Sequence, residues 1–118
     1  MSTYTWNPEE YPVTFINNEN QLNELSVKLS KATRVAVDTE THNAALFEDG
    51  LWAALRVISI ALKMPDDSYE AYVIDVRDIP SKPLADVMRS ITLADAWNAN
   101  FDDRVLDLAG CNVQEWRD

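Results

Sequence analysis

The stretch Arg34-Val-Ala-Val-Asp-Thr-Glu-Thr41 is the most informative part of this sequence. Its first part, Arg34 to Asp38, is an apolar, β-branched run, which is typical of a buried strand. Asp38 and Glu40 stand two residues apart where that run ends. Side chains at positions i and i+2 of a strand point to the same face, so both carboxylates are expected to meet beside the sheet. Two hard oxygen ligands at one point suit Mg²⁺ or Mn²⁺.

The same pair of acids also has a simpler explanation. Asp is common at strand ends and turns in any protein, because its side chain bonds to nearby backbone and tolerates turn conformations. Asp38 and Glu40 taken alone therefore leave two interpretations open, a metal site and a strand that turns into solvent.

The residues before this stretch predict three elements. Residues 1–12 are polar, aromatic and Pro-containing and are expected to be an extended lead-in. A short strand is expected over 13–16. Leucines at helical spacing predict an amphipathic helix over about 19–31, with Asn17 or Asn18 as its N-cap.

The residues after it predict alternating strands and helices. A loop is expected from Thr41 to about Ala54, followed by strands over 56–62 and 71–75 that are joined by a turn and pair antiparallel. The remaining elements are a helix opened by Pro83, a short strand over 92–97, and a helix over about 102–109 that Gly110 ends. This order predicts an α/β fold with a mixed sheet.

Composition limits the class of protein. The chain has 118 residues and a hydrophobic fraction of 47%, which favours one folded domain over a disordered chain. No apolar run approaches the roughly 20 residues of a membrane helix, and the N-terminus lacks the pattern of a secretory signal. The single cysteine, Cys111, has no partner for a disulfide, so a reducing cytoplasm is expected and a structural role is favoured for this thiol.

The net charge of −10 constrains any nucleic-acid function. A protein that holds nucleic acid by counterion release alone is expected to be basic. A nuclease that binds divalent cations can be acidic, because the cations bring positive charge to the site. The charge therefore disfavours a stand-alone DNA-coating protein.

A second polar motif lies further along, in Trp97-Asn-Ala-Asn-Phe-Asp-Asp-Arg-Val-Leu106. Asn98 and Asp102 bracket the expected transition from strand to helix. An acid at a helix start is stabilised by the helix dipole, which gives Asp102 a purely structural explanation. Asp103 competes with Asp102 for any role at this point.

Together the two motifs resemble the first and second motifs of the DEDD exonucleases, the DnaQ-like branch of the ribonuclease H fold. The closest resemblance is to the proofreading domain of the bacterial DNA polymerase I family, and it extends from about residue 13 to the end of the chain. It implies a ribonuclease H-like mixed sheet flanked by helices.

The resemblance also implies the roles of individual residues. Asp38, Glu40 and Asp102 would be catalytic ligands of a two-metal Mg²⁺ or Mn²⁺ site that hydrolyses phosphodiester bonds. The residues expected to contact substrate are Thr39, Thr41, His42, Asn98 and Phe101. For His42, the single histidine, an ordinary loop residue is the favoured explanation, and contact with a phosphate or with the attacking water is the alternative.

One part of the family pattern is missing. The resemblance calls for a fourth carboxylate in a third motif on a later helix, and no Tyr or His follows Asn98 at all. We therefore expect residues 13–118 to be the N-terminal part of an exonuclease domain, lacking its C-terminal helices. Asp107 and Asp118 are weak substitutes. Such a chain is expected to be poorly stable alone or to pair with a partner, such as a second chain carrying the rest of the domain or a DNA polymerase.

The functional expectation is a proofreading 3′–5′ exonuclease in DNA replication, in the cytoplasm of a bacterial or phage-infected cell. Its partner would be single-stranded DNA or a frayed primer 3′ end, and no membrane is expected. The alternative is a catalytically inactive module of the same fold that binds nucleic acid or a polymerase. An RNA-processing exonuclease of this fold would differ in substrate alone.

Overall fold

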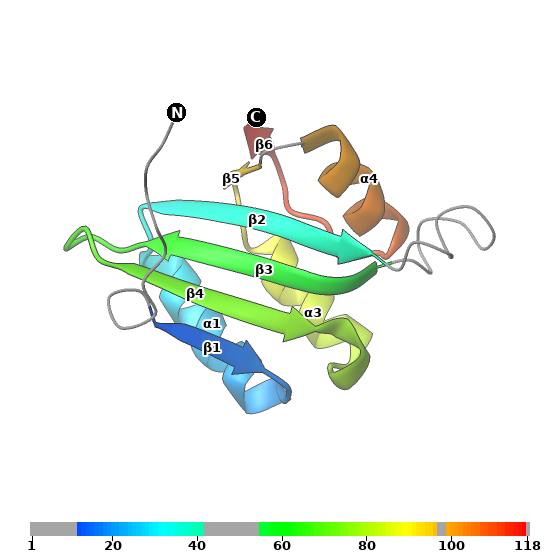
Figure 1. Cartoon of the computed structure of the whole chain (residues 1–118), viewed down its shortest axis with the longest axis horizontal. Helices are drawn as coiled ribbons and strands as arrows, with labels where there is room; N and C mark the ends of the chain where they lie inside the picture. Colours follow the sequence, from blue (N-terminus) through cyan, green and yellow to red (C-terminus); the bar gives the residue numbers. More distant parts are fainter. Residues whose placement is uncertain (1–11, 42–54, 97–98, 118) are drawn as a thin grey trace.

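The computed structural model describes residues 12–41, 55–96 and 99–117. Within them, six strands form one sheet in the order β1-β4-β3-β2-β5-β6 (Figure 1). The strands are β1 (Val13–Ile16), β2 (Arg34–Thr41), β3 (Leu55–Lys63), β4 (Tyr69–Asp75), β5 (Ala94–Asp95) and β6 (Trp116–Arg117). The helices are α1 (Glu19–Lys31), α3 (Ser81–Arg89) and α4 (Ala99–Leu108), with a short 3-10 helix, η2 (Val76–Asp78).

The sheet is mixed, as the order of elements predicts. β3 pairs antiparallel with both β2 and β4, which confirms the predicted hairpin. β1 runs parallel to β4, β5 parallel to β2, and β6 parallel to β5. The sequence did not assign β6, and it placed a longer strand over 92–97 where β5 has two residues.

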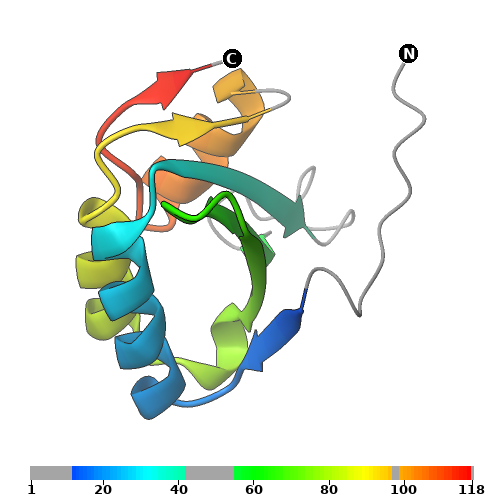
Figure 2. The same cartoon turned by 90° about the vertical axis from the view of Figure 1, so that its left-hand side faces the viewer.

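One face of the sheet carries the hydrophobic core. Helices α1 and α3 lie side by side against this inner face, on the concave side of the curved sheet (Figure 2). Apolar residues from the helices and from alternate strand positions are fully buried there, among them Leu22, Leu25, Ile58, Ile60 and Met88. Burying a side chain of this size stabilises the fold by about 1.5–3 kcal/mol, so this layer is the main source of stability.

Local sequence signals explain most element ends. Asn18 caps α1, and its side chain accepts a hydrogen bond from the Gln21 amide at 2.9 Å. Gly110 follows α4 with φ = 76°, a conformation that favours glycine and ends the helix. The helix predicted to begin at Pro83 begins at Ser81, which places this proline in the first turn, where its missing N–H costs nothing. Helix α4 likewise begins at Ala99, before the predicted start at Asp102.

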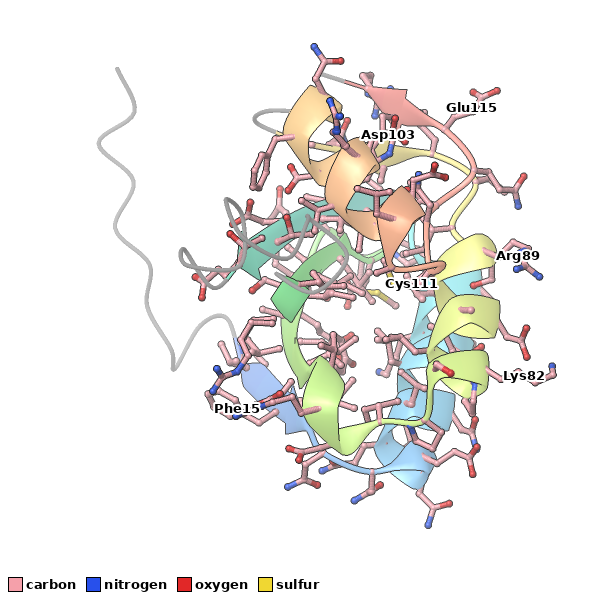
Figure 3. All side chains as sticks on the ribbon, turned by 90° about the vertical axis from the view of Figure 1, so that its right-hand side faces the viewer. Phe15, Lys82, Arg89, Asp103, Cys111 and Glu115 are labelled. Atoms are coloured by element: carbon pink, nitrogen blue, oxygen red, sulfur yellow. The ribbon has the colours of Figure 1, made fainter. Side chains whose placement is uncertain are left out.

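The opposite face of the sheet, called the open face below, carries smaller and more polar side chains. The strand register aligns Val13, Ala71, Ala61 and Ala36 in one row across β1, β4, β3 and β2. Phe15, from β1, is 68% exposed and points away from α3, whose Lys82 and Arg89 project on the other side of the molecule (Figure 3). No helix in the described part of the chain is long and apolar enough to span a membrane.

Candidate functional site

Strand β2 presents its polar motif by simple alternation. Val37 and Thr39 are buried on the inner face, whereas Asp38 and Glu40 are exposed on the open face. The structure therefore places the two acids on one face, as the i, i+2 spacing predicts. The buried strand expected here is buried on its inner side, at Val37 and Thr39, while Ala36 and Asp38 are exposed on the open face.

The neighbours of the two acids come from β3 and β4. Ser59 is the register partner of Asp38, and Val57 is the partner of Glu40. Asp75 of β4 is paired with Val57, so it lies in the same row as Glu40, two strands away. The register shifts between Glu40 and Thr41, and such an irregularity re-aims side chains at a strand end.

Among the described residues, Asp38 and Glu40 differ from Asp75 and Asp95 of the open face in having no charge partner. Neither of the two carboxylates forms a hydrogen bond or an ion pair with another described residue. Asp75, by contrast, is paired with Arg77 at 2.8 Å, and hydrogen bonds from Arg77 lower the pKa of Asp75 to about 2. Two carboxylates on one accessible face, without a cationic partner among the described residues, leave their oxygens free to take up a bound cation.

Asp102 connects the second motif to the first. It lies in the first turn of α4 and is 2% exposed. Its Oδ1 accepts hydrogen bonds from the amide of Thr39 at 3.2 Å and from the Thr39 hydroxyl at 2.5 Å. The third predicted acid is thus anchored to the residue between the other two.

The structure separates Asp102 from its competitor. Asp103 is exposed on the outer side of α4, where its carboxylate accepts a hydrogen bond from Asn112 at 2.6 Å (Figure 3). Asp107 is also exposed on α4. Of the acids on α4 in the described part of the chain, Asp102 is the one whose carboxylate accepts hydrogen bonds from β2, so the choice of Asp102 over Asp103 agrees with the geometry.

The fit of these residues to a divalent cation is partial. Carboxylate oxygens are the donors that Mg²⁺ and Mn²⁺ prefer, and Asp38 and Glu40 present them together on an accessible face. Among the described residues, however, no group of three or more His, Cys, Asp or Glu side chains is placed to hold a metal ion. The described part of the chain therefore supplies two possible ligands, Asp38 and Glu40, and a third acid bonded to the residue between them, but not a complete set of metal ligands.

A shallow hollow of about 740 Å³ extends from Asp38 along the open face. Its floor is the row of small residues that includes Ala36, Ala61 and Ala71, and Asp95 lies at its edge. Asp95 is held between Arg34 at 2.5 Å and Arg117 at 2.6 Å, so it serves as a structural ion pair. Small side chains let another molecular surface approach the backbone closely, and this hollow leads up to the two unpaired acids.

The remaining predicted site residues fall into three groups. Thr41 ends β2 and Phe101 lies on α4, and both are partly buried. Thr39 is 7% exposed with its hydroxyl bonded to Asp102, so its side chain faces away from the open face and is not placed to touch a substrate there. His42, Asn98 and Asp118 lie outside the described residues.

The Thr39–Asp102 bond was missed by sequence reasoning. A polar threonine at an inward position of a strand, two residues after the buried Val37, was the available signal. Cys111 agrees with its structural interpretation, since it is buried below α4 and burial raises the pKa of its thiol to about 11 (Figure 3).

Comparison with known proteins gives a family and a fold. A family model described as 3′–5′ exonuclease matches residues 13–116. A crystal structure of Trypanosoma brucei RNase D in complex with RNA U12 is similar with a TM-score of 0.68 and 15% identity, covering 90% of this chain and 37% of that one. The complex of the same enzyme with GMP gives a TM-score of 0.70 and 13% identity, covering 91% of this chain and 33% of that one.

The similarities to solved structures concern the fold. At such low identity they show the shared fold alone, and they confirm the predicted ribonuclease H-like sheet. The chain spans about a third of the length of the solved structures it resembles. No curated protein matches it.

Proposed function

This chain belongs to the 3′–5′ exonuclease family, and we propose that it acts as a metal-dependent 3′–5′ exonuclease domain. The observation that carries the proposal is that the carboxylates of Asp38 and Glu40 lie on the accessible face of β2 without a partner among the described residues, and that Asp102 is bonded to the residue between them. A folding role does not require two adjacent acids without cationic partners. A cation-assisted reaction at a strand end does require them.

The proposed cofactor is Mg²⁺ or Mn²⁺. When bound, such a cation would stabilise charge on the scissile phosphate and lower the pKa of a bound water. Asp38 and Glu40 would hold it on the open face, and Asp102 would add negative charge at the edge of β2. The cation also accounts for the acidity of the chain, because it supplies the positive charge that attracts phosphate.

We propose that a partner polypeptide completes the metal site. The described residues lack a closed set of three metal ligands, and the hollow next to Asp38 has a floor of small side chains. A second chain that carries the rest of the domain, or an associated DNA polymerase, would supply the missing ligand from the open side.

The proposed substrate is the 3′ end of single-stranded DNA or of a frayed primer. The motif Val-Ala-Val-Asp-Thr-Glu-Thr41 and its spacing to Asp102 support DNA, through their resemblance to proofreading domains. The solved structures with the same fold are of an RNase, and one of them holds RNA. RNA is therefore the alternative substrate, and a direct comparison decides between the two.

A non-catalytic module is the second candidate. It is favoured by one observation, that no metal-holding group of three is assembled among the described residues. In that case the fold would serve to bind nucleic acid or a polymerase without turnover.

The test is cleavage of 5′-labelled DNA and RNA of one sequence by the full chain with Mn²⁺ or Mg²⁺. We expect a ladder of DNA shortened from its 3′ end, lost with EDTA and reduced about 100-fold or more in the Asp38→Ala, Glu40→Ala double variant, because several kcal/mol of transition-state stabilisation would be removed. Asp103→Asn is the matched control, since Asp103 is an acid on the outer side of α4.

The other outcomes are equally informative. A faster ladder on RNA would replace the DNA assignment and keep the exonuclease proposal. Absence of cleavage by demonstrably folded protein, together with binding of the labelled strand, would support the non-catalytic module.

A further inference from the structure

We propose that Thr39 is a positioning residue, whose amide and hydroxyl together hold the Asp102 carboxylate at the edge of β2 beside Asp38 and Glu40. The hydrogen bonds between Thr39 and Asp102 are seen in the structure. Their effect on metal binding rests on the proposed function. Thr39 is one of two buried polar side chains among the described residues, and the other is Asp102.

The edge of β2 explains why an anchor is needed. β5 is short and pairs with β2 through Ala36 and Asp95 alone. Beyond that pair, the described residues include no strand that continues along this edge. The Thr39 amide therefore points to a place where a sheet would normally offer a carbonyl, and a buried amide without an acceptor is costly. The Asp102 carboxylate takes the place of that missing strand.

The threonine side chain adds something that the backbone alone does not. Any residue at position 39 offers an amide to Asp102, but only a residue with a β-hydroxyl donates a second hydrogen bond. Both donors reach Oδ1, the amide at 3.2 Å and the hydroxyl at 2.5 Å. Two donors from different directions on one oxygen restrict the rotation of the carboxylate more than one donor does.

The contact also joins two parts of the chain that are far apart in sequence. Thr39 and Asp102 are 63 residues apart, and the bond ties β2 to the first turn of α4. If the bond is lost, α4 keeps its buried residues Val105 and Leu106, so the helix is still packed. We therefore expect the loss to change the position of Asp102 more than the fold.

A metal-free experiment tests the contact first. Wild type, Thr39→Ser and Thr39→Val are compared by NMR, using the side-chain carboxyl ¹³C signal of Asp102 and the amide signal of residue 39. The serine variant should keep the wild-type carboxyl shift, and the valine variant should change it. Thr33→Val is the matched control, because the Thr33 hydroxyl also donates a hydrogen bond, in this case to the backbone carbonyl of Lys63 at 3.1 Å, away from the site.

A metal titration then tests the consequence. Mn²⁺ alone is titrated into the same variants and its affinity is measured. Loss of a group that orients a ligand typically weakens metal binding about 10- to 100-fold, and this is the expected loss for Thr39→Val. Thr39→Ser should restore affinity to near wild type, and Thr33→Val should leave it unchanged.

The two measurements separate the possible failures. If Thr39→Val leaves both the Asp102 signal and the Mn²⁺ affinity as in wild type, the positioning role is overturned. If the Asp102 signal shifts but wild type binds no Mn²⁺, the anchor stands and the proposed metal-dependent function fails. If Thr39→Val does not fold, Thr39→Ser and Thr39→Ala replace it, since these two differ in the hydroxyl alone, and equal Mn²⁺ affinities for them would overturn the proposal.

Discussion

The two faces of the sheet are made by the same strands, yet they differ in chemistry. Along β2 and β3, alternate residues such as Val37, Ile58 and Ile60 are buried against α1 and α3. The residues between them, including Asp38, Glu40 and Ala61, are exposed on the open face. The inner face buries its apolar side chains, whereas the open face carries two acids that have no partner among the described residues. Stability is thus concentrated on one face and reactivity on the other.

This division has a physical reason. Packing a core requires close contact and exclusion of water, which an ionised carboxylate without a partner opposes. A cation site requires accessible carboxylates that no Arg or Lys already occupies. The eight-residue strand β2 meets both requirements, because successive side chains point to opposite faces and the residues of one face can differ in type from those of the other.

The largest expected change in stability comes from a substitution on the inner face. Ile58→Ala should lower the free energy of unfolding by about 2–5 kcal/mol, since it opens a cavity in a fully buried layer. Val57→Ala, the next residue on the open face, should cost about 1 kcal/mol or less because this side chain is only partly buried. Chemical denaturation of both variants measures the difference. Equal losses would mean that the open face is also covered in solution.

A cation should act on the open face alone. Mn²⁺ at 100 times its dissociation constant should raise the free energy of unfolding of wild type by about 2.7 kcal/mol, because it binds the folded state. Asp38→Asn should abolish most of this gain, and Asp103→Asn should keep it. Thermal melts with and without Mn²⁺ provide the measurement, and stabilisation that survives in Asp38→Asn would place the cation elsewhere.

Much of this division could be predicted from sequence, and the parts that could not have clear causes. Period-2 alternation around Asp38 placed both acids on one face, and leucine spacing predicted α1 with its true bounds. The sequence predicted β5 with bounds that were too long and did not assign β6, because the extent of a two-residue strand is set by its partners. The Thr39–Asp102 bond links positions 63 residues apart, and the one local signal, a polar residue at an inward position of β2, does not identify its partner.

The site residues were chosen from the family resemblance. Spacing brought Asp38 and Glu40 to one face but left a metal site and a strand end as alternatives, and the choice of Asp102 over Asp103 is consistent with the burial of Asp102. That these acids bind a metal stays a prediction. The inward direction of Thr39 was not foreseen, although alternation from Asp38 implies it. The roles of His42 and Asn98 stay predictions.

A smaller effect is expected at the end of α4, the helix that carries Asp102. Gly110 has φ = 76°, and a Cβ placed there would meet no atom within 4 Å. The cost of Gly110→Ala is therefore conformational strain alone, about 1 kcal/mol in the free energy of unfolding. Ala109→Gly, one residue earlier, is a control that changes helix propensity instead. A Gly110→Ala protein as stable as wild type would show that the turn has another conformation.

The smallest effect concerns the paired acid of the open face, Asp95. Hydrogen bonds from Arg117 and then from Arg34 lower its pKa to about 2, below the usual value near 3.8. A carboxyl whose folded pKa is depressed stabilises the fold above its unfolded pKa and loses that contribution as the pH falls toward the folded pKa. Because the ion pairs are largely solvent-exposed, Asp95→Asn should cost only about 1 kcal/mol or less at pH 7.

The pH dependence of that cost separates Asp95 from the two acids of the proposed site. The difference in free energy of unfolding between wild type and Asp95→Asn should be constant from pH 7 to about pH 5 and should shrink between about pH 4 and pH 2. Asp38→Asn should not reduce the free energy of unfolding at pH 7 without metal, since Asp38 has no cationic partner among the described residues to lose. A stability loss in Asp38→Asn as large as in Asp95→Asn would mean that Asp38 is a structural acid too. The contrast between paired and unpaired carboxylates on the open face would then no longer mark the site.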